Sequence, residues 1–336
     1  MTLVVTGAAG WFGQAFLARL AGRGAEGVRV VVRSPHDVPL VGSALPSARI
    51  SVADTTDADA LREVFEGLGE CQVVHAAGVI HPGRVGEFHQ VNVVGTRNVL
   101  RSALGAGLTR FVHLSSNSAI GTNPSPDDLF RDNEPFDPYL GYGASKMDAE
   151  LLVKDTLVDA GVAGVILRPP WFYGRFQPDR QARFLKTVRR GRFPLVGDGS
   201  NRRSMVDVDS LAAAADLALA VEVADVPAYW IADRRPYRMT EIIEAVWQAA
   251  SAEGLTVREK VLRLPAAAGK AAYRIDAALQ GSGRYQQEIH VAGELDKNIA
   301  CSVEGAERDL GFRPSESLVD GMRRSYRYGL ENGQDV

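Results

Sequence analysis

The sequence predicts an α/β fold in which a doubly wound parallel sheet is followed by a smaller C-terminal α/β domain. Two observations indicate the sheet: short apolar runs alternate with helical patterns from residue 3 to residue 167, and a glycine-rich turn follows the first run. A third observation indicates the second domain, because the alternation breaks down beyond residue 168. The 336 residues are enough for one large domain or two unequal ones.

The strands of the first domain are predicted from short apolar runs with many β-branched residues. These runs lie at residues 3–6, 28–32, 49–53, 72–75, 110–114 and 164–167. Apolar residues at helical spacing predict the helices between them at residues 14–20, 57–68, 88–104 and 142–160. Residues 119–141 hold four prolines and little periodicity, so we expect a loop there.

The rest of the chain divides between the two domains. Residues 206–232 hold an alanine-rich helix and a short strand, and we expect them to return to the first domain, which otherwise spans residues 1–168. Residues 169–205 and 233–330 then form the second domain, with a strand at 256–264 and an apolar helix at 265–279. Residues 331–336 are expected to form a frayed tail.

Composition excludes several classes of function. A formal net charge of -3 argues against nucleic acid or an anionic membrane as the main partner. The start of the chain has no basic segment before a long apolar run, so neither a signal peptide nor a membrane span is expected. Cys71 and Cys301 lie far apart, which favours a reducing, cytoplasmic location. The six histidines show no metal-binding spacing, and no metal is expected.

The turn after the first strand predicts a dinucleotide site. Gly7, Gly10 and Gly13 would permit a tight turn, close approach of backbone to a pyrophosphate, and close packing of helix on strand. The N-terminus of the following helix offers free N–H groups to the phosphates. Trp11 and Phe12 lie within this turn and are included among the candidates for cofactor binding.

The residue after the second strand bears on the identity of the dinucleotide. An Asp or Glu there suits the free ribose 2′-hydroxyl of NAD, whereas an Arg suits the 2′-phosphate of NADP. Arg33 occupies this place, which favours NADP(H) over NAD(H). Asp37 is close enough in sequence to oppose the phosphate, so both cofactors stay open.

Other strand ends are expected near the cofactor, because such sheets bind ligands at the carboxyl ends of their strands. Asp54 follows the third strand and could meet the adenine. Three small residues follow the fourth strand and would let backbone lie against the cofactor: Ala76, Ala77 and Gly78. Four polar residues, 115–118, follow the fifth strand.

Tyr142 and Lys146 carry the chemistry expected at this edge. Residues four apart lie on one face of a helix, one above the other. A free phenol has a pKa near ~10 and is a poor base at neutral pH. An ammonium one turn away favours the phenolate and lowers that pKa, so that the tyrosine can exchange a proton with a substrate oxygen.

These motifs together resemble those of the extended short-chain dehydrogenase/reductases. The shared features are Thr6-Gly7-x-x-Gly10-x-x-Gly13, Ser116, Tyr142-x-x-x-Lys146 and the strand end Leu167-Arg168-Pro169, in that order along nearly the whole chain. The resemblance implies a Rossmann domain followed by a smaller substrate-binding domain. It also implies an NAD(P)-dependent enzyme that moves hydride at a secondary alcohol or ketone carbon.

The resemblance further implies roles for single residues. Ser116 would hold the substrate oxygen, although Ser115 or Ser118 could take its place if the alignment shifts. Tyr142 would be the acid/base, and Lys146 would hold the nicotinamide ribose while lowering the pKa of Tyr142. Two other residues are added as candidates for cofactor binding: Asn92 and Pro169.

The resemblance leaves the reaction subclass open. The 4,6-dehydratases of this superfamily carry an Asp-Glu pair directly after the catalytic Thr, where this chain has Asn117 and Ser118, so water elimination by that route is not expected. The glutamate used by the related decarboxylases is missing as well. A non-catalytic NADP-sensing regulator is disfavoured, because such chains typically lose the Tyr or the Lys, and both are present.

Two enzymatic alternatives remain. The favoured one is a 3β-hydroxysteroid-dehydrogenase-like enzyme or ketoreductase, since Trp171 stands where epimerases have the Asn that contacts the nucleotide diphosphate. The apolar helix 265–279 also resembles the lipid-facing segment of that branch. The other is a sugar-nucleotide epimerase with tightly bound NAD, in which Arg203 would grip the diphosphate. Ser118, Trp171 and Arg203 are the candidates for substrate binding.

A homodimer is also implied by the resemblance. Helices 88–104 and 142–160 of two subunits would form a four-helix contact. Such helices need apolar residues beyond the stripe that faces their own sheet. Val99, Val153 and Leu157 are the candidates for this outer surface.

Overall fold

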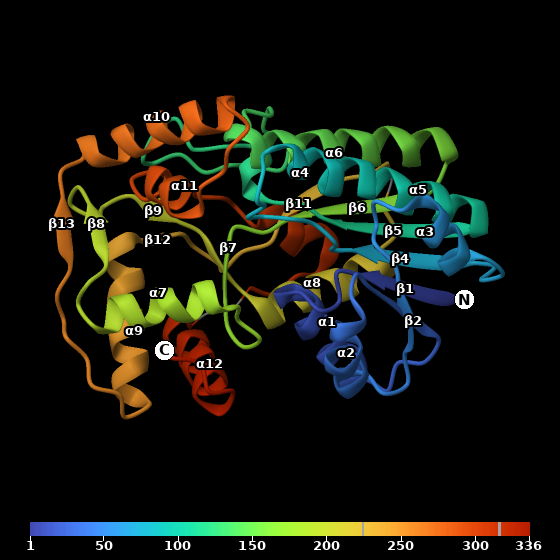
Figure 1. The fold of residues 1–336 in the computed structure, drawn as a ribbon, viewed down its shortest axis with the longest axis horizontal. Helices are drawn as coiled ribbons and strands as arrows, with labels where there is room; N and C mark the ends of the chain where they lie inside the picture. The colour runs from blue at the N-terminus through green and yellow to red at the C-terminus, as the bar shows by residue number, and fades with distance from the viewer. Residues whose placement is uncertain (224, 315–316) are drawn as a thin grey trace.

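A seven-stranded parallel sheet lies on the right of Figure 1, in a computed structural model that describes residues 1–223, 225–314 and 317–336. Its strands are β1 (Thr2–Thr6), β2 (Val28–Val32), β3 (Arg49–Val52), β4 (Cys71–His75), β5 (Leu108–Leu114), β6 (Ala163–Arg168) and β11 (Ala228–Trp230). They follow the order β11-β6-β5-β4-β1-β2-β3, and every neighbouring pair is parallel. The predicted α/β fold, a Rossmann-type doubly wound sheet, is confirmed.

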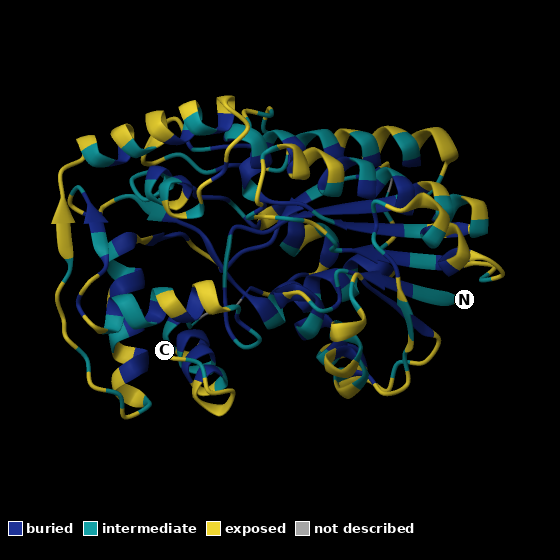
Figure 2. Cartoon of the chain, viewed as in Figure 1, coloured by how far each residue is buried: buried dark blue, intermediate teal, exposed yellow. Residues whose placement is uncertain are grey.

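Helices cover both faces of this sheet (Figure 1). One face carries α3 (Ala58–Phe65), α5 (Gly95–Ala106) and α6 (Leu140–Ala160), and the other carries α1 (Trp11–Gly22), α2 (Val38–Ala44) and α8 (Val208–Ala220). Strands covered on both faces are expected to be continuously apolar. β2 fits this expectation at its four valines, and all five of its residues are buried, with Arg29 as the one charged residue. Figure 2 shows the exposed residues on the outer sides of the helices.

The strand order reverses next to β1. The chain runs outward from β1 through β2 to β3, and then forms β4, β5 and β6 on the other side of β1. The carboxyl ends of β1 and β4 therefore border a crevice, which is where open parallel sheets bind ligands. Thr6 pairs with His75 in the register of these two strands, so the turns that follow them lie side by side.

A second, smaller core lies on the left of Figure 1. The helices of this region are α7 (Asp179–Arg189), α9 (Met239–Ala252), α10 (Ala267–Gly281), α11 (Gln287–Glu294) and α12 (Leu318–Glu331). Its short strands form pairs: β7 (Trp171–Tyr173) with β10 (Met205–Asp207), β9 (Arg202–Arg203) with β12 (Tyr237–Arg238), and β8 (Pro194–Val196) with β13 (Leu262–Leu264). Between these segments the chain returns to the large sheet, where β11 pairs with β6. The exact division into two domains stays a prediction.

Several elements differ from their predictions. The strand expected at 256–264 is limited to β13, because its partner β8 offers only three residues for pairing. The helix expected at 88–104 is formed in three pieces, α4 (Gly86–Phe88), a π-helical turn (His89–Val94) and α5. α1 begins at Trp11 rather than at residue 14. Further short helical turns lie at Pro35–Asp37, Asn117–Ala119 and Ala306–Leu310.

The C-terminal residues, expected to be frayed, pack against α7 instead. Val336 is buried, and Nε of Arg189 donates to its carbonyl oxygen at 3.1 Å. Lys186 forms an ion pair with Asp335. The basic side chains of α7 thus hold a polar segment whose composition alone indicates no structure.

The apolar residues expected at a dimer contact face the core instead. Val99, Val153 and Leu157 are fully buried in the cluster that joins the sheet to α5 and α6. These positions form the inner stripe of their helices, so they offer nothing to a second subunit. On α6, the large apolar side chains that stay exposed are those of Leu151 and Val158.

Three further findings concern the described residues as a whole. No helix in the described ranges combines the length and apolar character needed to cross a membrane. Nor do these ranges bring together three or more His, Cys, Asp or Glu side chains in a group that could hold a metal ion. Cys71 and Cys301 are both buried and free.

Candidate active site

The glycine turn forms a cradle with no room for a side chain at Gly7 or Gly13. Gly7 has a φ of 70°, and a Cβ placed on it would lie 2.5 Å from the carbonyl carbon of Ala76. A Cβ on Gly13 would lie 2.3 Å from the carbonyl oxygen of Gly7. No side chain caps α1 at Gly10, so the N–H groups of its first turn are left for phosphate oxygens. These residues fit a dinucleotide pyrophosphate.

The side chains of Trp11 and Phe12 support the turn from within. Nε1 of Trp11 donates to the carbonyl oxygen of Arg175 at 2.7 Å, and the indole meets the ring of Phe172 edge-on. Phe12 stacks on Phe16 with ring centroids 5.7 Å apart. Both rings are buried, so these two residues would reach a cofactor through their backbone N–H groups.

The residues expected around the adenosine end lie at the carboxyl ends of β2 and β3. Arg33 is exposed and makes no hydrogen bond or ion pair with the described residues, which leaves its guanidinium free for a ligand. Asp37 lies in the short turn Pro35–Asp37 that follows it. The carboxylate of Asp54 accepts from the N–H and the hydroxyl of Thr56, both at 2.8 Å, so a local turn already uses it.

Asn92 connects the loop after β4 to helix α6. Its Nδ2 donates to Oγ of Ser145 at 2.9 Å, and its Oδ1 accepts from the N–H of Val79 at 2.8 Å. A Cβ on Gly78 would lie 3.1 Å from Oδ1 of Asn92 and 3.6 Å from Nζ of Lys146. The loop Ala76, Ala77 and Gly78 is therefore held against α6 beside the glycine turn.

Tyr142 lies buried in the first turn of α6, with the hydroxyl of Ser116 near enough to act on its pKa. Burial raises the pKa of Tyr142 to about 12, whereas the Ser116 hydroxyl and the charge of Arg180 act to lower it. The Ser116 hydroxyl also lies 3.4 Å from that of Ser118. A substrate oxygen could thus meet two hydroxyl groups at one point.

Ser115 is engaged elsewhere, which supports the choice of Ser116. Its hydroxyl donates to Glu150, which also accepts from Nη2 of Arg168 at 2.7 Å. Both charged residues are almost fully buried, so the pair is structural. Pro169 follows Arg168 and is buried, and its carbonyl oxygen accepts from the N–H of Asn117 at 3.2 Å.

Lys146 points toward the end of β5. Its Nζ donates to the carbonyl oxygen of Leu114 at 2.9 Å, and burial lowers the pKa of Lys146 to about 8, partly offset by Glu150. The expected lowering of the phenol pKa is therefore wrong for this structure. Burial outweighs the nearby charges, and the cation that acts on Tyr142 is Arg180 rather than Lys146.

Arg203 and Trp171 lie together but are already engaged. Nη1 of Arg203 donates to the carbonyl oxygen of Glu294 at 3.1 Å, and Nη2 lies 3.9 Å from its carboxylate. The guanidinium carbon lies 5.9 Å from the centre of the Trp171 ring, whose Nε1 donates to Gln181 at 3.2 Å. A nucleotide diphosphate would have to compete with Glu294 for this buried arginine.

The structure adds site residues that no sequence pattern indicates. Tyr285 and Phe88 pack on Tyr142 in one buried cluster. The hydroxyl of Tyr285 lies 2.7 Å from Nδ1 of His81, and burial lowers the pKa of His81 to about 4, so this imidazole is neutral near pH 7. Arg180, in the first turn of α7, is near enough to affect the pKa values of His81, Tyr142 and Tyr285.

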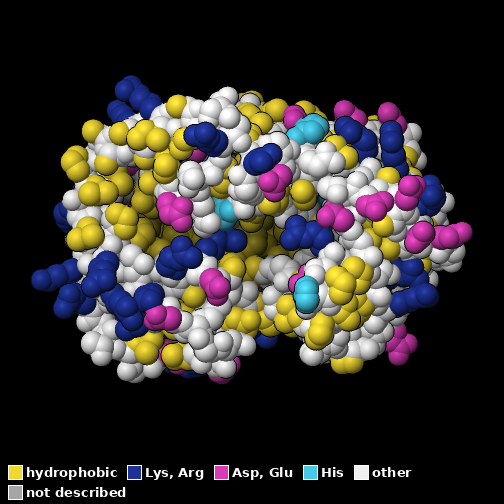
Figure 3. Space-filling view, in the orientation of Figure 1, with side chains coloured by type: hydrophobic (Ala, Val, Ile, Leu, Met, Phe, Trp, Pro, Cys, Tyr) yellow, Lys and Arg dark blue, Asp and Glu magenta, His cyan; other side chains and the backbone are white. Residues whose placement is uncertain are grey.

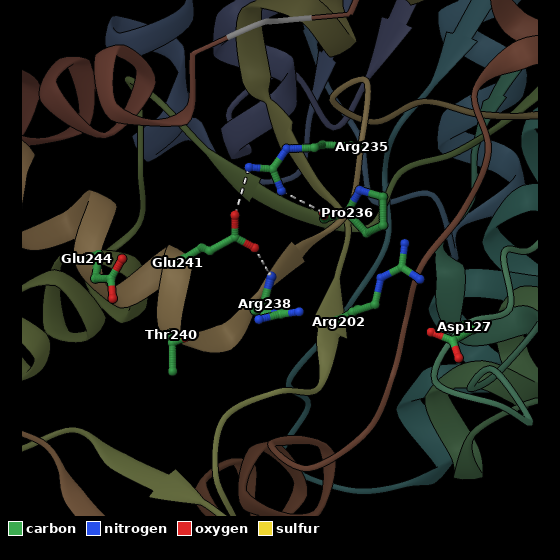
Figure 4. A pocket seen from close by; sticks show the side chains of 8 residues that line it. All are labelled: Asp127, Arg202, Arg235, Pro236, Arg238, Thr240, Glu241 and Glu244. Carbon is green, nitrogen blue, oxygen red and sulfur yellow. Dashed lines mark hydrogen bonds and ion pairs between the residues drawn. The ribbon is translucent and has the colours of Figure 1, made fainter.

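One face of the molecule is shown in Figure 3. A hollow lies in the middle of this face, with hydrophobic side chains in its depth and basic side chains on either side. A separate pocket of about 650 Å³ lies where β12 leads into α9 (Figure 4). Three arginines and three acidic residues line that pocket, and Arg235 pairs with Glu241 at 2.7 Å. No residue predicted for the active site lines it.

Comparison with known proteins agrees with this geometry. Residues 3–232 match the NAD dependent epimerase/dehydratase family. The chain is 40% identical to Uncharacterized protein y4nL of Sinorhizobium fredii, over 99% of this chain and 96% of that protein. It is 30% identical to the 2-alkyl-3-oxoalkanoate reductase of Stenotrophomonas maltophilia, over 96% of this chain and 98% of that protein.

Among solved structures, the chain is similar to DesIV, a dTDP-glucose 4,6-dehydratase of Streptomyces venezuelae with NAD and TYD bound. The TM-score is 0.77, with 25% identity over 99% of this chain and 98% of that one. The glycine cradle and the Ser116–Tyr142 pair therefore lie in an enzyme of the short-chain dehydrogenase/reductase type. The chain belongs to the NAD-dependent epimerase/dehydratase family, within the extended short-chain dehydrogenase/reductases.

Proposed function

We propose that the protein is an NAD(P)H-dependent ketoreductase that interconverts a ketone and a secondary alcohol on a small molecule. The observation that carries this proposal is the buried pair of Ser116 and Tyr142, whose hydroxyl groups lie near one another beside the glycine turn. The similarity to a 2-alkyl-3-oxoalkanoate reductase along nearly the whole chain supports it. The single-residue roles below are part of the proposal.

In the direction of reduction, Ser116 holds the carbonyl oxygen and Tyr142 donates the proton. A phenol pKa raised to about 12 keeps Tyr142 protonated near pH 7, which is the form that an acid requires. Lys146 lies beside Gly78, where it can hold the nicotinamide ribose. The bound nicotinamide supplies the hydride that the carbonyl carbon accepts.

A sugar-nucleotide epimerase with tightly bound NAD is the second candidate, because the family and the similarity to DesIV include sugar-nucleotide enzymes. Two features count against it. Arg203 is already bound to Glu294 and lies over Trp171. Trp171 also stands where epimerases have the Asn that contacts the nucleotide diphosphate.

We further propose that NADP(H) is preferred. The unpaired guanidinium of Arg33 lies at the end of β2, where a ribose 2′-phosphate would be placed. Paired, charge-assisted hydrogen bonds from arginine suit a phosphate. The preference is expected to be roughly tenfold to a few hundredfold, because each such bond contributes ~1.5–3 kcal/mol.

The test is the reduction of a medium-chain 2-alkyl-3-oxoalkanoate, followed by the absorbance of NADPH or NADH. We expect turnover with both, a higher kcat/KM for NADPH, and loss of that preference in Arg33→Ala. Tyr142→Phe should lower kcat by ~10² or more without changing the melting temperature. NAD that co-purifies and stays bound, with no oxidation of added NADPH or NADH, would instead identify an epimerase.

A further inference from the structure

Arg180 is the basic residue of α7 that pairs with no residue in the described part of the chain. α7 carries four basic residues, and three of them contact an oxygen of the chain. Arg183 lies 3.9 Å from Glu288, Lys186 pairs with Asp335, and Arg189 donates to the carbonyl oxygen of Val336 at 2.6 Å. Arg180 makes no hydrogen bond or ion pair with any described residue.

Arg180 lies within electrostatic range of the proposed acid. Its charge acts on Tyr142, Tyr285 and His81, which all belong to the site. Burial lowers the pKa of Arg180 although the residue is exposed to solvent. A side chain that is accessible to solvent and yet surrounded by protein lies in a concave part of the surface.

The next residue in the helix supplies a second, independent sign of a ligand. Gln181 is 2% exposed, and its Oε1 accepts from Nε1 of Trp171 at 3.2 Å. Its Nε2 has no hydrogen-bond partner among the described residues. Buried donors are nearly always paired, so an unpaired one beside an unpaired cation indicates a group that is missing from the chain itself.

The acidic residues near Arg180 do not neutralise its charge. Asp179, in the same helical turn, is exposed and makes no ion pair with a described residue. Glu294, whose charge reaches Tyr142, is bound to Arg203. Since no acidic side chain within the described ranges is paired with Arg180, an incoming anion meets an available positive charge.

We propose that Arg180, assisted by Gln181, binds an acidic group of the substrate and thereby places the neighbouring keto carbon at Tyr142. The chemical class is a 3-oxo acid, whose carboxylate an arginine can hold through two parallel hydrogen bonds. Phe88, Trp171 and Tyr285 are apolar neighbours suited to its alkyl chain. This inference rests on the proposed ketoreductase function and names the substrate class of that same site.

The test compares a medium-chain 2-alkyl-3-oxoalkanoic acid with its methyl ester, which has the same keto group and no charge. Wild type is expected to have a KM for the acid at least tenfold below that for the ester. Arg180→Ala should raise the KM of the acid roughly tenfold to a hundredfold and leave that of the ester unchanged. Arg180→Lys should restore part of the preference. Arg183→Ala, one turn along α7 and paired with Glu288, is the matched control and should change neither KM.

Binding of the 3-hydroxy acid product to Tyr142→Phe gives a readout that does not depend on turnover. Calorimetry should show a Kd that Arg180→Ala raises by the same factor as the KM of the acid. Equal KM values for acid and ester in wild type, or equal effects of Arg180→Ala on both, would overturn the anion site while the reductase function stands. Turnover of neither compound would overturn the reductase function itself.

Discussion

At the scale of single residues, burial shifts the pKa values of the two groups used by the proposed mechanism in opposite directions. It raises the pKa of Tyr142 to about 12 and lowers that of Lys146 to about 8, since in each case the charged form loses its hydration. Both shifts favour the neutral side chain. Near pH 7 the phenol therefore keeps its proton, while the ammonium of Lys146 is within reach of titration.

The pH dependence of reduction should report Lys146. We expect kcat/KM to be level between about pH 6 and 7.5 and to fall as Lys146 loses its charge near pH 8, because this ratio reports groups of the free enzyme. The measurement is a series of initial rates with the keto substrate at saturating concentration and NADPH varied, which gives kcat/KM for NADPH. A profile that stays level to pH 9.5 would show that the charge of Lys146 is not required.

We expect the protein to stay folded at the pH values, near and above 8, at which kcat/KM falls. The pKa of Lys146 lies below its ordinary value of 10.5, so the unfolded chain binds more protons between about pH 8 and 10.5. The contribution of Lys146 to the free energy of unfolding therefore rises with pH across that window. Melting curves recorded at the same pH values should confirm that the inactive enzyme remains folded.

At the scale of elements, the first turn of α6 depends on helices that lie far along the chain. Leu140 has a φ of 51°, which is strained for a branched side chain. The N–H of Gly141 donates to Oε1 of Gln280 at 3.1 Å. Nε2 of Gln280 donates to Asp276 at 3.0 Å, and Nδ1 of His290 lies 2.7 Å from the same carboxylate. α10 and α11 thus hold the turn that carries Tyr142.

Gln280→Met should disturb this turn while keeping the volume of the side chain. The N–H of Gly141 and the carboxylate of Asp276 would each lose a partner, and an unsatisfied buried group costs ~1–3 kcal/mol. We expect kcat to fall about tenfold and the free energy of unfolding to drop by ~1–3 kcal/mol, as measured by urea titration. Gln248→Met, at an exposed site on α9, is the control and should change neither quantity.

At the scale of the whole molecule, α6 leaves an apolar strip on the surface. Leu151 is 40% exposed and Val158 is 50% exposed. Residues seven apart lie two turns along the same helix face. The resemblance to the extended short-chain enzymes implies a homodimer at this face, and we expect these two side chains to form part of it.

Light scattering at micromolar concentration tests the dimer. We expect wild type to have twice the mass of the chain and the double variant Leu151→Glu, Val158→Glu to have the mass of one chain, because buried carboxylates facing one another repel. Leu330→Glu, at a 47% exposed site on α12, should leave the dimer intact. A monomeric wild type would contradict the proposed contact.

Features set by local sequence could be predicted because neighbouring residues alone determine them. The buried strand at Val28–Val32 follows from four β-branched valines in five residues. The turn at Gly7 needs a positive φ and has no room for a Cβ, and the spacing of Tyr142 and Lys146 puts both on one helix face. These local signals gave the fold class and placed the candidate site at one edge of the sheet.

What the tertiary structure alone decided is the surroundings of those residues. The pKa of Tyr142 is raised because distant segments bury it, and Arg180 and Tyr285 reach it from other parts of the chain. Arg203 resembles a diphosphate-binding residue in sequence, yet Glu294 already occupies it. Desolvation and pairing depend on which side chains are in contact in the folded protein. The spacing of residues along the chain does not indicate contacts between distant segments.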